Sequence, residues 1–231
     1  LGYNTAAALQ TIWQVNPHCR VQVIGLELNP IVPQAAITDQ LCDSWDEKYI
    51  RILTQIAFEH QIQMDYLQAN LLIGDARSLI LQVHKSGFQA DAIFLDPFSP
   101  PQCPQLWTLE FIQKVSECLH ENGLMATYSC AAAVRTALLT AGLAVGSTPP
   151  IGRRTPGTIA GHFKHGTKSS ISFFSPLSQG EKEHLLTRAA IPYRDPHLSD
   201  TTEVILKRRQ EEVQVSTLES SSQWRKRWLK S

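Results

Sequence analysis

Residues 91–100, with the sequence Asp-Ala-Ile-Phe-Leu-Asp-Pro-Phe-Ser-Pro, place a carboxylate at the end of a buried strand. Residues 92–95 are apolar, a pattern typical of a strand covered on both faces. Pro97 has no N–H to donate to a neighbouring strand, so the strand is expected to end at Asp96. Ligands of open α/β sheets bind at this carboxyl edge, and an aromatic residue, Phe98, follows. An isolated Asp-Pro pair is more often an exposed turn, so the other strands are needed to interpret it.

Two further apolar runs also end in acidic residues. Residues 21–26 are followed by Glu27, and residues 67–73 are followed by Gly74-Asp75. In nucleoside-binding α/β folds, an acidic residue about 20 positions after a glycine turn accepts hydrogen bonds from ribose hydroxyls. A surface glutamate at a strand end is common, but three strand-ending carboxylates in succession indicate a shared ligand site.

The glycine turn is represented by the first residues, Leu1-Gly2-Tyr3-Asn4-Thr5, which lead into an alanine-rich helical segment. A glycine followed by polar residues that can cap a helix is typical of the last part of a glycine-rich strand-to-helix turn. The strand that should precede this turn, and the leading glycines, are not in the sequence. We therefore expect the first strand to be missing and the cofactor pocket to be incomplete as written.

Strands and helices alternate over residues 1–163, which predicts an α/β fold with a mostly parallel, doubly wound sheet. Helices are expected at 44–60, 106–119 and 131–140, and further strands at 124–128, 143–145 and 158–163. The composition changes after residue 163, where Ser178 and Glu181 form a capping box that opens a helix. We therefore expect two parts, an N-terminally incomplete α/β domain over residues 1–163 and a basic helical C-terminal extension over residues 164–231.

Composition narrows the class of protein. No apolar run approaches the roughly 20 residues that span a bilayer, and no basic-then-apolar leader opens the chain. Five cysteines without a C-x-x-C pair favour free thiols in a reducing compartment over disulfides or a zinc site. We therefore expect a cytoplasmic protein with no membrane segment and no metal.

Opposite charges in the two parts of the chain add to a formal net charge of zero. Residues 1–150 hold 7 Lys and Arg against 13 Asp and Glu, giving −6, whereas residues 151–231 hold 14 against 8, giving +6. Such an asymmetry points to a polyanionic partner, although solvated helices also carry uneven charge.

The glycine turn and the three carboxylates occur in the order in which Rossmann-like class I methyltransferases bind S-adenosylmethionine, so the chain resembles these enzymes. The resemblance implies that the turn at Gly2 and Asn4 passes the methionine part of the cofactor. It also implies that Glu27 binds the ribose and that Asp75 binds the adenine amino group.

Asp96-Pro97-Phe98 resembles the Asp/Asn-Pro-Pro-aromatic signature of amino-group methyltransferases. By this resemblance, Asp96 and Pro97 lie beside the methyl end of the cofactor. An amine attacks through its lone pair, so acceptors have to orient its N–H bonds and take up charge as the nitrogen becomes cationic. The Asp96 carboxylate and the Pro97 carbonyl can do this, and Phe98 can flank a base.

A closer resemblance covers about residues 1–163. Residues 91–108, residues 123–129 and the loop at 151–154 are similar to the tRNA 5-methylaminomethyl-2-thiouridine methyltransferases. That family is the methyltransferase half of the bifunctional MnmC enzymes and also occurs alone. The resemblance implies methyl transfer from S-adenosylmethionine to the aminomethyl nitrogen of 5-aminomethyl-2-thiouridine at the tRNA wobble position. Because the FAD-dependent oxidase domain is absent, the chain resembles the stand-alone type.

The resemblance also implies roles for individual residues. Asp96 would be the catalytic residue that holds the amine and helps to deprotonate it. The side chains expected to contact substrate are Phe98, Trp107, Tyr128, Arg135, Arg153 and Arg154. The candidates for contacts with tRNA phosphates are Arg135, Arg153, Arg154, Lys164 and Lys168. Such contacts would make tRNA binding strongly dependent on salt.

Two other functions stay open at this point. A related methyl- or aminopropyl-transferase could act on a small amine or a protein, although polyamine substrates favour an acidic pocket and the loop at 152–154 is basic. A cofactor-free RNA-binding module is the second alternative. The C-terminal run Trp224-Arg225-Lys226-Arg227-Trp228 could stack on RNA bases or dock the terminus on the body, and docking is slightly favoured.

Overall fold

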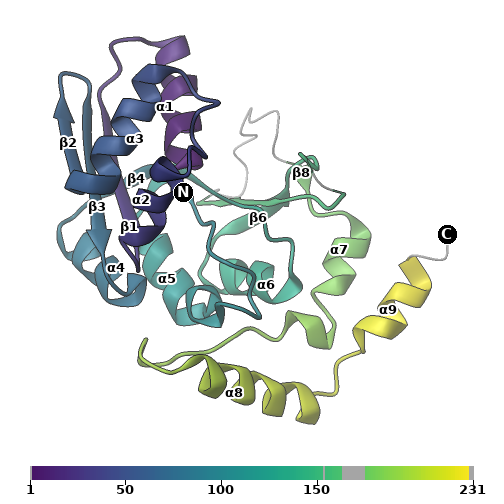
Figure 1. The fold of residues 1–231 in the computed structure, drawn as a ribbon. Helices are drawn as coiled ribbons and strands as arrows, with labels where there is room; N and C mark the ends of the chain where they lie inside the picture. The colour runs from purple at the N-terminus through teal and green to yellow at the C-terminus, as the bar shows by residue number, and fades with distance from the viewer. Residues whose placement is uncertain (1, 153, 163–174, 229–231) are drawn as a thin grey trace. The chain divides into compact units, whose positions relative to one another are not determined.

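The structure, a computed structural model, describes residues 2–152, 154–162 and 175–228 and divides into two compact units (Figure 1). The first unit is Leu1–Leu79 and the second is Ile80–Ser231. The boundary expected after residue 163 lies inside the second unit, because the C-terminal extension packs with the preceding strands and helices.

The first unit contains a three-stranded sheet with the strand order β1-β3-β2. Its strands are β1 (Val21–Glu27), β2 (Gln61–Met64) and β3 (Leu67–Ile73), and its helices are α1 (Tyr3–Val15), α2 (Ile31–Thr38) and α3 (Glu47–Glu59). Strands β1 and β3 run parallel, as their apolar runs predicted, whereas β2 forms an antiparallel hairpin with β3. This hairpin was not predicted, because β2 is short and largely exposed.

Helices α1 and α3 bury their apolar faces in one core. Leu9 and Trp13, four residues apart on α1, are buried against this core, which also contains Tyr49 and Ile52 of α3. The rings of Trp13 and Tyr49 stack with their centroids 6.3 Å apart. The prediction that the apolar positions of the segment 44–60 face the core is therefore confirmed for both residues of α3.

The second unit contains a five-stranded sheet with the order β4-β5-β7-β6-β8. The strands are β4 (Ala90–Phe94), β5 (Leu119–Thr127), β6 (Ala144–Ser147), β7 (Thr158–Gly161) and β8 (Ser175–Pro176). Among the described strands of this sheet, only β4 and β5 run parallel. The α/β class is confirmed, but a mostly parallel sheet is wrong for the described strands. Strands β6 and β7 follow each other through a loop too short for the helical crossover that a parallel pair requires.

The helices of the second unit continue to the end of the described chain. They are α4 (Ala76–Lys85, which begins in the first unit), η1 (Pro104–Trp107), α5 (Leu109–Glu117), α6 (Ala132–Thr140), α7 (Gln179–His184), η2 (Arg188–Ala190), α8 (Thr202–Val215) and α9 (Ser221–Trp228). The single helix expected at 106–119 is divided at Thr108, whose side chain caps α5 by accepting from the N–H of Phe111. Asn122 and Gly123, which follow α5 in the sequence, lie within β5. A Cβ at Gly123 would lie 2.7 Å from the carbonyl oxygen of Ala90, so only glycine fits there.

The C-terminal extension is tied to the second unit by buried polar groups. The N–H of Leu109 donates to the carbonyl of Tyr193 at 3.0 Å, and the N–H of Asp195 donates to the Glu110 carboxylate at 2.7 Å. Both Thr187 and Asp195 are fully buried. The extension is therefore part of the packed unit wherever it is described.

The aromatic C-terminal run docks on α7. The Trp224 indole N–H donates to the carbonyl of Gly180 at 3.0 Å, and its ring stacks on His184 with centroids 4.1 Å apart. The Trp228 indole donates to Glu183 at 2.9 Å. The prediction that these tryptophans dock the terminus is confirmed.

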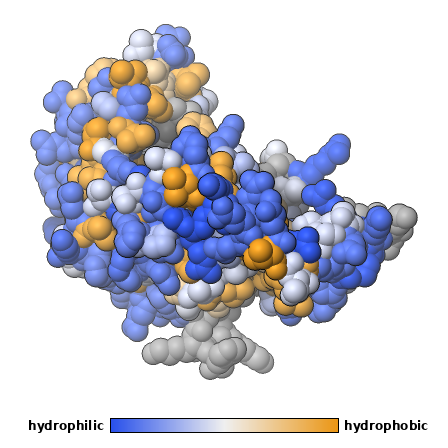
Figure 2. All heavy atoms as spheres, turned by 90° about the horizontal axis from the view of Figure 1, so that it is seen from below, coloured by the Kyte–Doolittle hydropathy of each residue, from blue (hydrophilic) through white to orange (hydrophobic). Residues whose placement is uncertain are grey.

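One face of the surface and the described helices bear on a membrane role. Apolar residues on the face in Figure 2 are scattered among hydrophilic ones. None of the described helices is long and apolar enough to cross a bilayer. The described part of the chain also contains no group of three or more His, Cys, Asp or Glu placed to hold a metal ion.

Candidate active site

Two of the strand-ending carboxylates lie at one edge of the first unit's sheet. In the parallel register of β1 and β3, Glu27 is opposite Ile73. The N–H of Gly74 donates to the Glu27 carbonyl at 2.8 Å, and Asp75 follows directly. The parallel pairing therefore brings Glu27 and Asp75 to the same carboxyl edge, where α/β sheets bind ligands.

Neighbouring groups orient both carboxylates. Glu27 Oε1 accepts from the N–H of Asn29 at 2.9 Å. Asp75 accepts from both the backbone N–H and the guanidinium of Arg77, with Nη2 2.7 Å from Oδ2. These hydrogen bonds from Arg77 outweigh burial and lower the pKa of Asp75 below its usual value, so the group is an anion at neutral pH. Nothing in the local pattern assigned this role to Arg77.

Gly2 has the backbone conformation that a glycine turn requires. Its φ of 92° lies in the left-handed region, and its carbonyl accepts from the N–H of Ala6 in the first turn of α1. A Cβ at Gly2 would lie 2.8 Å from a methyl group of Leu53. Asn4 lies in the same first turn and is exposed. A larger residue at position 2 would therefore strain the entry into the helix.

In the second unit, β4 and β5 bring another carboxylate to a sheet edge. Phe94 is opposite Ala126, and the N–H of Leu95 donates to the Ala126 carbonyl at 2.9 Å. Asp96 and Tyr128 each follow one of these parallel strands, so they occupy the same carboxyl edge. The Asp96 residue is exposed there.

Two side chains hold the loop after Asp96 by its backbone carbonyls. The Trp107 indole N–H donates to the carbonyl of Phe98 at 2.7 Å, and the Tyr128 hydroxyl donates to the carbonyl of Pro97 at 3.0 Å. The two aromatic rings meet edge to face, with centroids 6.3 Å apart. We call residues 96–98 the catalytic loop, after the role that the resemblance led us to expect for Asp96.

The side chains around the catalytic loop differ sharply in exposure. Phe98 is 78% exposed, whereas Trp107 is fully buried. A ring as exposed as that of Phe98 is available to a ligand. The expected substrate contact by Trp107 is not supported, because its ring is inaccessible and its N–H is committed to the loop.

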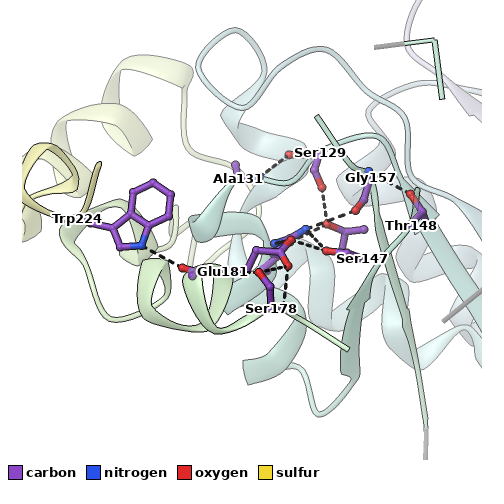
Figure 3. Close-up of polar contacts among 11 residues, drawn as sticks. Ser129, Ala131, Ser147, Thr148, Gly157, Ser178, Glu181 and Trp224 are labelled. Atoms are coloured by element: carbon purple, nitrogen blue, oxygen red, sulfur yellow. Dashed lines mark hydrogen bonds and ion pairs between the residues drawn. The ribbon is translucent and has the colours of Figure 1, made fainter. Parts of the chain in front are cut away.

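Arg135 lies inside the second unit, not on its surface. Figure 3 shows the polar contacts around its partner Glu181, which accepts hydrogen bonds from Ser147 and Ser178. Only 3% of Arg135 is exposed, and its guanidinium donates to Thr158 at 3.0 Å, to Ser147 at 2.9 Å and to Glu181 at 2.7 Å. The expected phosphate contact by Arg135 is not supported, since reaching a phosphate would break a buried ion pair. The partner carboxylate comes from α7, 46 residues away in the sequence.

Glu181 is the anionic centre of this buried network. Burial alone would raise its pKa, but hydrogen bonds from Ser147, Ser178 and Arg135 lower the pKa from 4.5 to about 2. The network also extends toward the sheet edge, because the Thr158 hydroxyl donates to the carbonyl of Ser129 at 2.6 Å. Ser129 directly follows Tyr128, so α7 is linked to the segment that holds the catalytic loop.

Of the four remaining cations predicted to contact phosphate, one is exposed and three lie outside the described residues. Arg154 is exposed. Arg153, Lys164 and Lys168 lie outside the described residues. Direct contact with a polyanion therefore stays a prediction for these four residues. Cys130, which follows the network residue Ser129, is partly buried.

Comparison with known proteins adds a family to this geometry. A sequence model of the family described as S-adenosyl-L-methionine-dependent methyltransferase matches residues 39–162, more than half of the chain. The chain belongs to this family. Its members use S-adenosylmethionine, so the expected methyltransferase class and cofactor are confirmed.

Relatives of this methyltransferase include proteins of tRNA modification. An uncharacterized protein of Methanocaldococcus jannaschii is 32% identical over 162 residues, covering 69% of this chain and 42% of that protein. The tRNA 5-methylaminomethyl-2-thiouridine biosynthesis bifunctional protein MnmC of Ralstonia nicotianae is 36% identical over 95 residues, covering 41% of this chain and 14% of that protein. The chain thus spans less than half the length of either relative.

A solved structure is similar over more of the chain. The crystal structure of MnmC2 from Aquifex aeolicus matches with a TM-score of 0.74 and 34% identity, covering 92% of this chain and 65% of that one. A match of this extent has to include much of the sequence after residue 163. The resemblance expected for about residues 1–163 therefore continues into the C-terminal extension of the methyltransferase.

The described residues fit the cofactor of the family. S-adenosylmethionine presents ribose hydroxyls and an adenine amino group, all hydrogen-bond donors. The first unit offers two oriented carboxylates, Glu27 and Asp75, at one sheet edge, and carboxylates are acceptors for such groups. The left-handed Gly2 adds a turn without a side chain at the start of a helix. The donor and acceptor chemistry is therefore complementary.

Proposed function

We propose that this methyltransferase transfers a methyl group from S-adenosylmethionine to the aminomethyl nitrogen of 5-aminomethyl-2-thiouridine at the wobble position of tRNA. The family supports the methyl donor, and the likeness to MnmC proteins supports the substrate. The observation that carries the proposal is the catalytic loop, which combines an exposed carboxylate, a fixed backbone carbonyl and an exposed aromatic ring.

The cofactor would be held by residues of the first unit. In this proposal Glu27 accepts hydrogen bonds from the ribose hydroxyls and Asp75 accepts from the adenine amino group. The turn at Gly2 and Asn4 passes the methionine part. When bound, S-adenosylmethionine supplies a methyl group on a positively charged sulfur.

The catalytic loop would hold the amine. The Asp96 carboxylate accepts an N–H hydrogen bond, keeps the lone pair directed, and balances the positive charge that develops on nitrogen. The Pro97 carbonyl accepts a second N–H. The Phe98 ring, exposed to solvent in the described structure, flanks the uracil base. Tyr128 lies at the same edge and donates to the Pro97 carbonyl.

The decisive experiment is methyl incorporation into tRNA that lacks only the final methyl group. The protein, labelled S-adenosylmethionine and this tRNA are incubated, and the labelled nucleoside is identified by mass spectrometry. We expect Asp96→Asn to lower kcat/KM by about 100-fold or more, the scale for losing a positioned acid–base group. Asp91→Asn, at an exposed aspartate within β4, the strand that Asp96 follows, is the matched control and should behave as the unaltered protein.

Each outcome separates the parts of the proposal. Full activity of Asp96→Asn would remove Asp96 from the catalytic machinery. Label that enters a small amine or a protein, but not tRNA, would contradict the substrate and leave the methyltransferase class intact. A filter assay with bulk tRNA distinguishes these cases before any purified tRNA is needed.

A further inference from the structure

We propose that Tyr128 and Trp107 are positioning residues that fix the catalytic loop through the backbone carbonyls of Pro97 and Phe98. This inference rests on the proposed function, because it concerns how Asp96 and Pro97 are presented to the amine. Neither residue needs to touch the substrate for this role. Both belong to the second unit, as does the loop itself.

The catalytic loop lies between the end of β4 and η1. It begins two residues after β4 ends at Phe94, and Pro97 cannot donate a backbone hydrogen bond. Phe98 is 78% exposed, so the packing of its side chain does not anchor the backbone. Hydrogen bonds to the carbonyls of Pro97 and Phe98 therefore determine the direction of both peptide groups.

The two donors are themselves rigidly placed. Trp107 is fully buried and lies in η1, and the following residue, Thr108, is also fully buried. Gln105 of η1 donates to the hydroxyl of Thr202 at 2.6 Å, which ties this segment to α8 of the extension. Burial of the Trp107 ring thus fixes the indole N–H that donates to the Phe98 carbonyl.

Tyr128 is held from its other side by the Arg135 network. The carbonyl of Ser129 accepts from Thr158, whose hydroxyl in turn accepts from Arg135. The Tyr128 ring also packs edge to face on Trp107. Both donors therefore approach the loop from ordered surroundings.

The hydrogen bond from Tyr128 has a direct chemical consequence at Pro97. A carbonyl oxygen has two lone pairs, and the hydroxyl occupies one of them. An amine N–H consequently has to approach along the other, which restricts the orientation of the nucleophile. A small error in the position of the nucleophile lowers the rate strongly, since a displacement of about 1 Å can reduce it about 100-fold.

The test is Tyr128→Phe in the protein, with Tyr66→Phe as the matched control. The first variant retains the ring and its contact with Trp107 but loses the hydroxyl, whereas Tyr66 lies in the turn between β2 and β3. We expect Tyr128→Phe to lower kcat by about tenfold, the scale for losing one orienting hydrogen bond. The KM for tRNA, the Kd for S-adenosylmethionine and the melting temperature should stay as in the control.

Amide hydrogen exchange gives a second readout that requires no activity. The N–H groups of Gln102 and Cys103 both donate to the carbonyl of Ser99, directly after the catalytic loop, at 2.8 and 2.9 Å. Their exchange should be at least about threefold faster in Tyr128→Phe and unchanged in Tyr66→Phe. A uniform increase across the second unit would indicate general destabilisation and overturn the positioning role.

The outcomes keep this inference separate from the proposed function. Wild-type kcat in Tyr128→Phe, with tRNA still methylated, would overturn the positioning role and leave the proposed function in place. An inactive unaltered protein would contradict the proposed function, and the exchange of Gln102 and Cys103 would then decide the positioning role alone. Unchanged exchange at both amides overturns it.

Discussion

Arg135 and Glu181 show how a charged pair is used at the scale of single residues. The guanidinium is 3% exposed and the Glu181 side chain is 24% exposed, and both ends of the pair have additional hydrogen-bond partners. Removing one partner of such a pair leaves the other charge buried without a counter-charge, which lowers the free energy of unfolding by about 3–5 kcal/mol. The pair joins α7 to α6, and the hydroxyls of Ser147 and Thr158 bring β6 and β7 into the same network.

The depressed pKa of Glu181 makes this contribution dependent on pH. Because the folded pKa of about 2 is below 4.5, its stabilising effect is complete above pH 4.5 and is lost as the pH falls toward 2. We expect Glu181→Gln to unfold more easily than the unaltered protein at neutral pH, by about 3 kcal/mol. This difference should shrink steadily as the pH falls from 4.5, and urea unfolding at several pH values measures it.

Glu211→Gln is the matched control for Glu181→Gln. Glu211 is 64% exposed on the side-chain scale and lies 4.0 Å from Lys207. Exposed pairs of this kind contribute about 0–1 kcal/mol, so the control should differ little from the unaltered protein at any pH. A Glu181→Gln difference that stays constant from neutral pH to pH 3 would contradict the linkage.

The positions of the candidate site residues were predicted best where a short stretch of sequence determines them. Strand ends fix the positions of Glu27, Asp75 and Asp96, and an apolar run followed by an acid is visible without a structure. The role of Arg135 could not be read this way, because its burial depends on a carboxylate 46 residues away. Substrate contacts by Tyr128 and Trp107 were expected from the family resemblance, but their side-chain donors reach backbone carbonyls that no sequence pattern identifies.

At the scale of elements, local sequence signals predicted individual strands and helix starts better than they predicted which strands pair with each other. The apolar runs gave β1 and β3, and the capping box at Ser178 gave the start of α7. The insertion of β7 between β5 and β6 was not predicted, because a four-residue strand does not specify its neighbours. The expected helix is divided at Thr108 because its hydroxyl caps α5. A capping residue has a non-helical backbone conformation, so the preceding helical turn cannot continue through it.

Helix α9 gives a prediction at this scale. Trp224 provides both a ring stacked on His184 and an indole donor to Gly180, whereas α9 has no buried residue. We expect Trp224→Ala to detach α9, so that trypsin cleaves after the adjacent basic residues about tenfold faster, equivalent to about 1.4 kcal/mol of docking energy.

Leu218→Ala is the comparison for the digestion. This residue precedes α9 and is 40% exposed, so its truncation should leave the cleavage rate unchanged. Gel electrophoresis and mass spectrometry follow the cleavage. Equal cleavage rates for Trp224→Ala and the unaltered protein would show that the tryptophan does not hold the helix.

At the scale of the whole molecule, much of the basic charge after residue 150 is used inside the fold. The ion pairs of the extension include Arg194–Glu212, Arg208–Asp200, Arg227–Glu183 and Arg227–Glu219. The guanidinium of Arg209 donates to two backbone carbonyls and lies over the Tyr193 ring. A count of charges therefore overstates the positive surface that a polyanion meets.

Exposed cations outside these pairs should carry the salt dependence of tRNA binding. We expect Arg154→Ser to weaken binding and to reduce the slope of log K against log salt by about 1, because one phosphate contact is lost. Filter binding at several KCl concentrations measures the slope. Lys85→Ser, an exposed cation at the end of α4, should leave it unchanged. Equal slopes for both variants would remove Arg154 from the tRNA surface.

The stacking of Trp224 on His184 also gives the C-terminus an optical signal. Burial, together with Arg225 and Arg135, lowers the pKa of His184 below 6.5, so the imidazole is neutral at physiological pH. A protonated imidazole in van der Waals contact quenches indole fluorescence far more than a neutral one. Acidification should therefore dim the emission of Trp224, and the midpoint of that change reports the state of the docked helix without any added label.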